Sequence, residues 1–171
     1  MKINAGCGDK KLIGYVNVDA NRDFKPDVCH DLRKVPWPFR SNSADFVLME
    51  NVLEHMPDTN KILAEIHRIL KPGGKVRIVV PHFLHQGAWR DPDHKKAFAP
   101  DSFKYYCASH PHFSKYNPFK FRLIKNRVHG MHYGSINFLG WMPNRVLRTL
   151  GNFIPGIVED IEVELLKVQK S

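Results

Sequence analysis

A glycine-containing turn near the amino terminus is the first place where this sequence could hold a ligand. Residues 3–8 read INAGCG, and Asp19 follows a second short apolar run. Gly6 and Gly8 carry no Cβ, so the backbone can approach a bound molecule closely. The carboxylate of Asp19 can accept hydrogen bonds from both hydroxyls of a ribose. A lone G-x-G also occurs in ordinary turns, so the turn needs support from the rest of the chain.

A dinucleotide is not the ligand that this turn predicts. The dinucleotide fingerprint is G-x-G-x-x-G, and the third glycine position is Lys11 here. Only residues 5–14 separate Asn4 from Tyr15, close to the lower limit for a strand-helix-strand crossover. A helix there can have little more than one turn and gives no long N-terminus for a pyrophosphate. The turn therefore favours a ligand with an uncharged or zwitterionic part.

The elements that must position these residues alternate between strands and helices. Short runs rich in β-branched residues predict strands at 15–19, 26–30, 44–49 and 75–80. Residues 58–74 predict a helix, with Asp58 or Thr59 as its cap and Pro72 near its end. Such alternation specifies a parallel sheet with helices on both faces, whose ligands bind beyond the carboxyl ends of the strands. Residues 160–168 alternate as a strand and predict an antiparallel pair with 121–129.

Composition and charge narrow the class of protein. The 171 residues are 43% apolar and carry a net charge of +9, yet no acidic residue occurs from Ser102 to Val158. This basic, aromatic part predicts an anionic partner or a solvated basic face. No apolar run approaches membrane-spanning length, and the three isolated cysteines indicate neither a disulfide framework nor a zinc knuckle. We expect a soluble, cytoplasmic protein.

Five motifs in order resemble the class I S-adenosylmethionine-dependent methyltransferases. They are INAGCG, Asp19 after the second strand, CHDL after the third, ADFVLMENVLEHM at the fourth and LKPGGKVRIVVP into the fifth, over residues 2 to about 81. The resemblance implies S-adenosylmethionine as cofactor. A later stretch, from PHF to FKYY, is similar to predicted methyltransferases that are sometimes encoded among surface-polysaccharide functions.

The resemblance also implies roles for individual residues. Gly6 and Gly8 would lie against the methionine part of the cofactor, in one loop with Asn4 and Cys7; Asn4 stands where many members have an acid. Asp19 would bind the ribose. Asp31 would reach the adenine amino group, with Leu32 against the ring. Glu50 and Asn51, at the end of the fourth strand, would line the space beside the methyl group.

Ionisable residues crowd the loop after the fifth strand, and three interpretations stay open. The residues are His82, His85, Asp91, Asp93 and His94. His82 or His94 could be a general base for an acceptor hydroxyl. His82, His85, Asp91 and His94 could instead bind a cation, although their spacing matches no closed zinc motif. Asp91-Pro92-Asp93 could also be a structural turn. We assign His82 and His94 as the catalytic candidates and no residue to a metal.

These observations predict a fold and a function. We expect an α/β, Rossmann-like, doubly wound seven-stranded mixed sheet, mostly parallel with an antiparallel C-terminal strand pair. The chain would be a single domain, 1–171, with 82–155 as acceptor-site and lid segment. It would methylate a small or glycan-like acceptor, for which an anionic group fits the basic charge, at oxygen or nitrogen. Less favoured alternatives are an RNA methyltransferase and a non-catalytic cofactor-binding subunit. The helical pattern at 143–156 predicts core packing or, alternatively, peripheral contact with a membrane.

Overall fold

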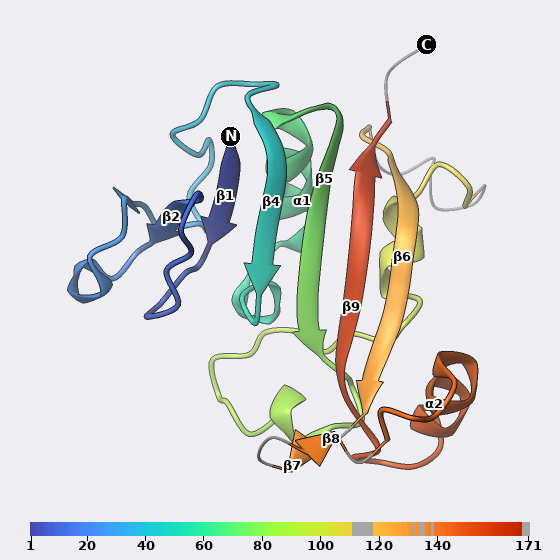
Figure 1. The fold of residues 1–171 in the computed structure, drawn as a ribbon. Helices are drawn as coiled ribbons and strands as arrows, with labels where there is room; N and C mark the ends of the chain where they lie inside the picture. Colours follow the sequence, from blue (N-terminus) through green and yellow to red (C-terminus); the bar gives the residue numbers. More distant parts are fainter. Residues whose placement is uncertain (111–117, 131, 134–135, 138, 169–171) are drawn as a thin grey trace.

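A seven-stranded sheet forms the centre of the computed structural model (Figure 1). The structure describes residues 1–110, 118–130, 132–133, 136–137 and 139–168. The strands are β1 (Lys2–Ala5), β2 (Val16–Asp19), β3 (Val28–Cys29), β4 (Ala44–Glu50), β5 (Leu70–Pro81), β6 (Phe121–Gly130) and β9 (Val158–Lys167). Two short strands, β7 (His132–Tyr133) and β8 (Ile136–Asn137), form a separate pair. Parts of the predicted lid segment, residues 111–117, 131, 134–135 and 138, lie outside the described residues.

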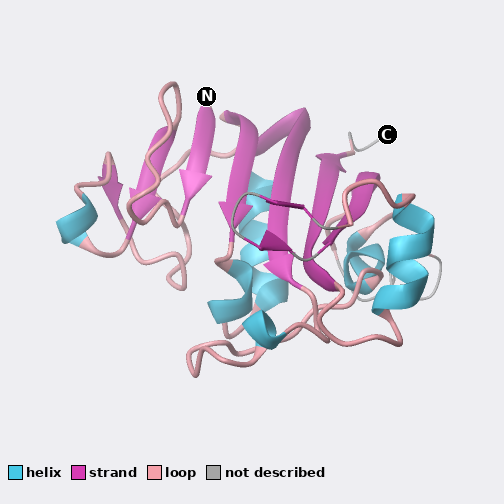
Figure 2. Ribbon diagram, turned by 60° about the horizontal axis from the view of Figure 1, so that its bottom comes forward, coloured by secondary structure: helices cyan, strands magenta, loops and turns pink. Residues whose placement is uncertain are grey.

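The strand order is β3-β2-β1-β4-β5-β9-β6. The strands from β3 to β5 are parallel, whereas β9 runs antiparallel between β5 and β6. This arrangement confirms the predicted mixed Rossmann-like sheet and its antiparallel C-terminal pair. The loops that follow the parallel strands gather at one edge of the sheet, which Figure 2 brings forward.

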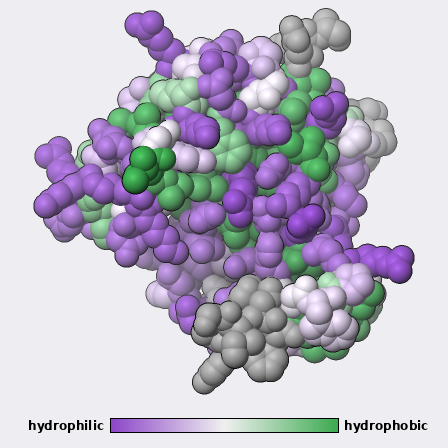
Figure 3. Space-filling view, in the orientation of Figure 1, coloured by the Kyte–Doolittle hydropathy of each residue, from purple (hydrophilic) through white to green (hydrophobic). Residues whose placement is uncertain are grey.

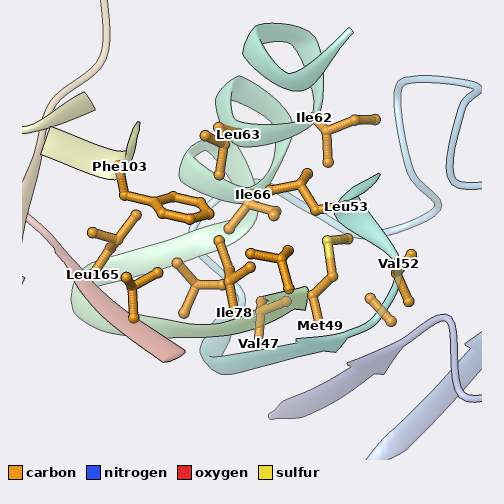
Figure 4. Packing of buried hydrophobic residues seen from close by; sticks show 14 of the residues in the cluster. Val47, Met49, Val52, Leu53, Ile62, Leu63, Ile66, Ile78, Phe103 and Leu165 are labelled. Carbon is orange, nitrogen blue, oxygen red and sulfur yellow. The ribbon is translucent and has the colours of Figure 1, made fainter. Parts of the chain in front are cut away.

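Helix α1 (Thr59–Ile69) covers one face of the sheet. The Asp58 side chain accepts a hydrogen bond from the Lys61 backbone N–H and caps the helix, as one of the two predicted residues. One apolar side of this helix is buried: Ile62, Leu63, Ile66 and Ile69 are at most 2% exposed. Figure 4 shows Ile62, Leu63 and Ile66 above Val47, Met49 and Ile78 from β4 and β5. This contact forms the main core.

The crossovers differ from the expectation of helices on both faces. Residues 6–15 form turns instead of the short helix that we predicted, and a 3-10 helix, Arg22–Phe24, is the only helical segment described between β2 and β3. These connections are too short to return to the sheet edge and also carry an α-helix. In Figure 1 α1 lies behind β4 and β5, and no described helix covers their near face. That face is mainly hydrophilic in Figure 3.

The predicted helix near the C-terminus is α2 (Asn144–Gly151), shorter than its sequence pattern. Leu147 packs in the core, whereas Phe153 and Ile154, which follow the helix, are 79% and 46% exposed. The prediction of core packing is therefore correct for the side of α2 that carries Leu147 and wrong for Phe153 and Ile154. In the described part of the chain, no helix combines the length and apolar character needed to cross a bilayer.

A buried carboxylate joins three neighbouring strands on the open face of the sheet. Glu162 of β9 is 2% exposed, although its place among the polar residues of an alternating strand is typical of a solvent-facing side chain. Its Oε1 lies 2.7 Å from Arg77 Nε of β5 and 2.8 Å from Lys125 Nζ of β6, and its Oε2 lies 2.9 Å from His129 Nε2. Burial opposes ionisation, but the hydrogen bonds from Lys125 and His129 and the charge of Arg77 outweigh it and lower the pKa of Glu162.

Replacing Glu162 by glutamine should destabilise the protein by about 1–3 kcal/mol, because the cationic side chains on both sides lose their shared anion. Unfolding in urea at neutral pH measures the change. Glu164→Gln, two residues along the same strand face and half-buried, is the matched control and should cost less than about 0.5 kcal/mol. Equal losses in the two variants would show that Glu162 does not hold the strands together.

Candidate active site

A cleft of about 620 Å³ opens at the carboxyl ends of the parallel strands. Its volume is in the usual range for small-molecule sites. Its walls come from the loops after β1, β2, β3, β4 and β5. They consist of Gly6, Asp19, Ala20, Phe24, Asp31, Leu32, Arg33, Val52, His55, Met56, Asp93 and Lys95. The sequence predicted four of these as cofactor-binding residues: Gly6, Asp19, Asp31 and Leu32.

Gly6 has a backbone conformation and surroundings that require glycine. Its φ is +75°, which side chains on L-residues rarely adopt. A Cβ at this position would lie 2.4 Å from Cγ2 of Val52, which is closer than atoms can pack. The Gly6 N–H donates to the carbonyl of Val18 at 2.8 Å and ties the turn to β2. The turn after β1 is therefore fixed against Val52 from the loop after β4, at the bottom of the cleft.

Asp19 ends β2 and shapes both loops beside it. Its Oδ2 accepts a hydrogen bond from the Gly8 N–H, and its Oδ1 accepts one from the Asn21 N–H, each at 2.9 Å. These bonds hold the side chain in place at the cleft wall. A carboxylate has about four lone-pair sites, so both oxygens keep acceptor capacity for hydroxyls of a ligand.

The loop after β3 supplies a further part of the cleft wall, with Asp31, Leu32 and Arg33. Leu32 is 5% exposed, and its carbonyl accepts a hydrogen bond from Trp37 Nε1 at 2.9 Å. Asp31 pairs with the Arg33 guanidinium through both oxygens, at 2.9 and 3.0 Å. The hydrogen bond from Arg33 holds the pKa of Asp31 below its ordinary value, so this carboxylate is ionised and fixed in position. Arg33 lies two residues after Asp31 in sequence and was not predicted to reach the cleft.

The other predicted cofactor residues lie near the cleft but outside its wall. Asn4 is buried, and its Nδ2 donates to the carbonyl of Lys10 and to Oδ1 of Asn17. Its amide therefore supports the turn from behind. Gly8 contacts Asp19 as described above. The remaining three are Cys7, which is buried, and Glu50 and Asn51, which are exposed at the end of β4. Their predicted contacts with a cofactor stay predictions.

No pattern in the sequence assigned Phe24, Met56 or Lys95 to a site. Phe24 is 39% exposed after β2, an unusual position for a large apolar side chain, and this exposure could not be known from the sequence. Lys95 arrives because the loop after β5 folds back onto the turn after β4. The N–H groups of Lys95 and Lys96 both donate to the carbonyl of Glu54, at 2.7 and 3.3 Å.

The structure separates the ionisable cluster that is compact in sequence. His82 is 1% exposed beyond the end of β5 and lies outside the cleft wall. His85 accepts a hydrogen bond from the Gly87 N–H and caps the 3-10 helix Gln86–Ala88. His94 instead packs edge-on against His55, with ring centroids 4.6 Å apart, and so lies behind the wall. Asp93 lines the cleft.

Glu54 lies beside His94 and was not singled out by the sequence. It belongs to the 3-10 helix Leu53–His55 after β4 and is 1% exposed. Burial raises the pKa of Glu54 to about 7 because the ionised form is poorly solvated there. Perturbed carboxyl groups of this kind are frequent at functional sites.

Comparison with known proteins identifies the amino-terminal part of the chain. Residues 5–78 match the family profile described as "Methyltransferase domain". Phosphoethanolamine N-methyltransferase 2 from Caenorhabditis elegans is 43% identical over 44 residues, which are 26% of this chain and 10% of that protein. Dimethylglycine N-methyltransferase from Parasynechococcus marenigrum is 41% identical over 72 residues, which are 42% of this chain and 25% of that protein. The chain thus spans a quarter or less of these curated relatives.

Solved structures agree over nearly the whole chain. A SAM-dependent methyltransferase from Archaeoglobus fulgidus superposes with a TM-score of 0.64 and 18% identity, covering 97% of this chain and 85% of that one. A putative methyltransferase from Bacillus halodurans gives a TM-score of 0.66 and 14% identity, covering 98% and 92%. Residues 5–78 of this chain thus match a methyltransferase domain, and the chain shares the fold of S-adenosylmethionine-dependent methyltransferases, with the cleft at the expected edge of the sheet.

Proposed function

We propose that the protein transfers the methyl group of S-adenosylmethionine to a small acceptor that carries an anionic group. The observation that carries this proposal is the cleft between the loops after β1 and β4, with a glycine floor and the carboxylates of Asp19 and Asp31 on its walls. Ligands of open α/β sheets bind where the strand order reverses, and here that point lies between β1 and β4.

The described residues fit the cofactor. Gly6 lines the cleft and carries no side chain, so its backbone can lie against the methionine part. Asp19 would accept hydrogen bonds from the ribose hydroxyls, and Asp31 one from the adenine amino group. Leu32, Val52 and Met56 give the apolar surfaces that an adenine ring and a thioether chain need. Bound there, the cofactor would supply an electrophilic methyl group.

Methyl transfer asks mainly for alignment. The nucleophile must approach the methyl carbon in line with the bond to sulfur, so the protein has to hold both reactants rather than exchange many protons. The loops after β4 and β5 add His55, Asp93 and Lys95 to the cleft lining. These three residues are distant in sequence from Asp19 and Asp31, which we propose to bind the adenosine. These side chains are our candidates for holding the acceptor.

Lys95 supports an anionic acceptor. Arg33 is already paired with Asp31 at 2.9 Å, whereas the Lys95 side chain is half exposed and its ammonium lies 4.0 Å from the more exposed carboxylate of Asp93. The two curated relatives are named for phosphoethanolamine and dimethylglycine, which both combine a nitrogen with an anionic group. We infer that this chain takes an acceptor of the same chemical kind, methylated at nitrogen or oxygen.

The two histidines predicted as bases differ in their surroundings. Burial, and then the charge of His85, lowers the pKa of His82 to about 4, and its Nδ1 accepts a hydrogen bond from the Leu84 N–H at 3.3 Å. His94 packs against His55, which lines the cleft. Of the two, His94 is therefore the one that borders the cleft, through His55, and we expect His82 to stay neutral inside the fold.

The proposal is tested first by cofactor binding. Calorimetric titration of the wild type with S-adenosylmethionine and its demethylated product should give saturable binding, and NAD should give none. Asp19→Asn should weaken binding at least about 10-fold, because one strong acceptor becomes a donor. Asp23→Asn, in the exposed 3-10 helix nearby, is the control. Unchanged affinity in Asp19→Asn would remove this residue from the site, and no binding of S-adenosylmethionine by the wild type would contradict the proposal.

The acceptor class is tested with a labelled methyl donor and a panel of small amines and alcohols. Compounds with a phosphate or carboxylate should be methylated faster than their neutral analogues. Lys95→Ala should raise KM for the anionic compounds by about 5-fold with little change in kcat, since it removes an exposed ion pair. Lys96→Ala, next in sequence but outside the cleft wall, should leave KM unchanged. Preference for neutral compounds would contradict the proposal.

The neutral state of His82 predicts how stability depends on pH. In the unfolded chain its pKa is near the ordinary 6.5, whereas in the fold it is about 4, so the unfolded state binds more protons between these values. Stability from this residue is present above pH 6.5 and is lost as the pH falls toward 4. The wild type should lose on the order of 2 kcal/mol more than His82→Gln over this range, measured by urea unfolding. Parallel pH curves would contradict the assignment.

A further inference from the structure

Three side chains that can bind a metal ion meet behind the cleft wall. Glu54, His55 and His94 each offer one oxygen or nitrogen, and these atoms lie within 4.8 Å of one another. Glu54 and His55 are neighbours on the 3-10 helix after β4, and His94 comes from the loop after β5. Within the described ranges, no other histidines, cysteines or carboxylates come together in this way. The grouping is a product of the fold, because the third member is distant in sequence.

Glu54 gives the first reason to assign a ligand to this cluster. Its side chain is almost completely buried, and neither carboxylate oxygen has a hydrogen-bond partner among the described residues. An ionised carboxylate in such a place costs several kcal/mol unless an opposite charge compensates it. The negative charges of Asp91 and Asp160 are also close enough to act on Glu54. A cation between Glu54 and the two histidines would compensate this local charge.

His94 gives the second reason, because its ring is held in the form that binds metals. Its Nδ1 lies 3.1 Å from the carbonyl oxygen of Ala88. A carbonyl can only accept, so Nδ1 carries the hydrogen and Nε2 keeps a free lone pair. Metal-binding histidines usually donate their second N–H to a backbone carbonyl or carboxylate in this manner. The nearest carboxylate oxygen recorded for Nε2, on Asp91, is 3.8 Å away and beyond hydrogen-bond distance.

The supporting backbone is also fixed. Both N–H groups of Lys95 and Lys96 donate to the carbonyl of Glu54, so the segment that carries His94 is tied directly to the segment that carries the other two ligands. The His55 and His94 rings stand edge to face at 78°, with centroids 4.6 Å apart. The fold thus holds the two imidazoles beside each other, with their ligand atoms and that of Glu54 within 4.8 Å of one another.

We propose that Glu54, His55 and His94 form a binding site for one divalent first-row transition cation, such as Zn²⁺. Two imidazoles and one carboxylate are a ligand set that suits these ions, whereas Mg²⁺ and Ca²⁺ prefer oxygen ligands. Three protein ligands leave coordination positions open, as in catalytic metal sites. His55 also lines the cleft, so the ion would lie at the cleft wall. The site itself does not depend on the proposed methyl transfer; if that transfer occurs, the ion could hold an anionic oxygen of the acceptor.

Binding of Co²⁺, followed by its visible absorption, tests the site without cofactor or acceptor. Purified full-length protein, freed of metal with a chelator, should bind roughly one Co²⁺ per chain with absorption typical of nitrogen and oxygen ligands, and Zn²⁺ should displace it. Glu54→Gln and His94→Ala should each weaken binding by at least about 10-fold. Zn²⁺ should also raise the melting temperature of the wild type and not that of either variant.

His85→Ala is the matched control, since His85 lies on the same loop, is half-buried and caps a neighbouring turn outside the cluster. It should bind Co²⁺ as tightly as the wild type. Circular dichroism shows whether each variant is folded, and Glu54→Gln keeps the shape of the native side chain. The proposal is overturned if the wild type shows no saturable binding, or if Glu54→Gln and His94→Ala, both folded, bind Co²⁺ as the wild type does.

Discussion

The pairing of β1 with β4 is the constraint on which the site depends. Ile3 lies opposite Val47 and Asn4 opposite Leu48 in this parallel pair, although the strands are separated by β2 and β3 in sequence. The chain leaves β1 toward β2 on one side and leaves β4 toward β5 on the other. The two connections therefore diverge, and a crevice opens between the carboxyl ends of the paired strands. Contact between Gly6 and Val52 closes the bottom of this crevice and fixes its depth.

The crossovers on the β1 side are short, and side-chain hydrogen bonds hold them in place. Asn4 links the turn after β1 to Asn17, and the Asn17 N–H and side chain both donate to Asp27. Asp19 holds the N–H groups of Gly8 and Asn21. Because these side chains and backbone groups hold one another, this part of the cleft wall keeps its shape without an α-helix between β1 and β2. Asn4 supports the turn through its amide hydrogen bonds.

The loop after β5 completes the site from the other side. Its histidines are close in sequence, yet they have three different surroundings: His82 is buried past β5, His85 caps a turn, and His94 reaches the segment after β4. The pair of hydrogen bonds to the Glu54 carbonyl decides this division, because it draws only the far end of the loop back over the cleft. The loop after β5 thus places Lys95 in the cleft wall and His94 just behind it, although most of the wall comes from the loops after the other parallel strands.

The sequence by itself determined the sheet class, the capped helix α1 and the residues that end the first three strands. These depend on local patterns, namely period, capping and glycine position, which require no distant partner. Gly6, Asp19, Asp31 and Leu32 were predictable for this reason, since they follow strands directly. Only the tertiary structure decided which residues of the post-β5 loop reach the cleft, that Glu54 meets His94, and that Glu162 is buried among cations. Those outcomes depend on contacts between segments far apart in the chain, and burial and charge neighbours are properties of the folded arrangement rather than of spacing.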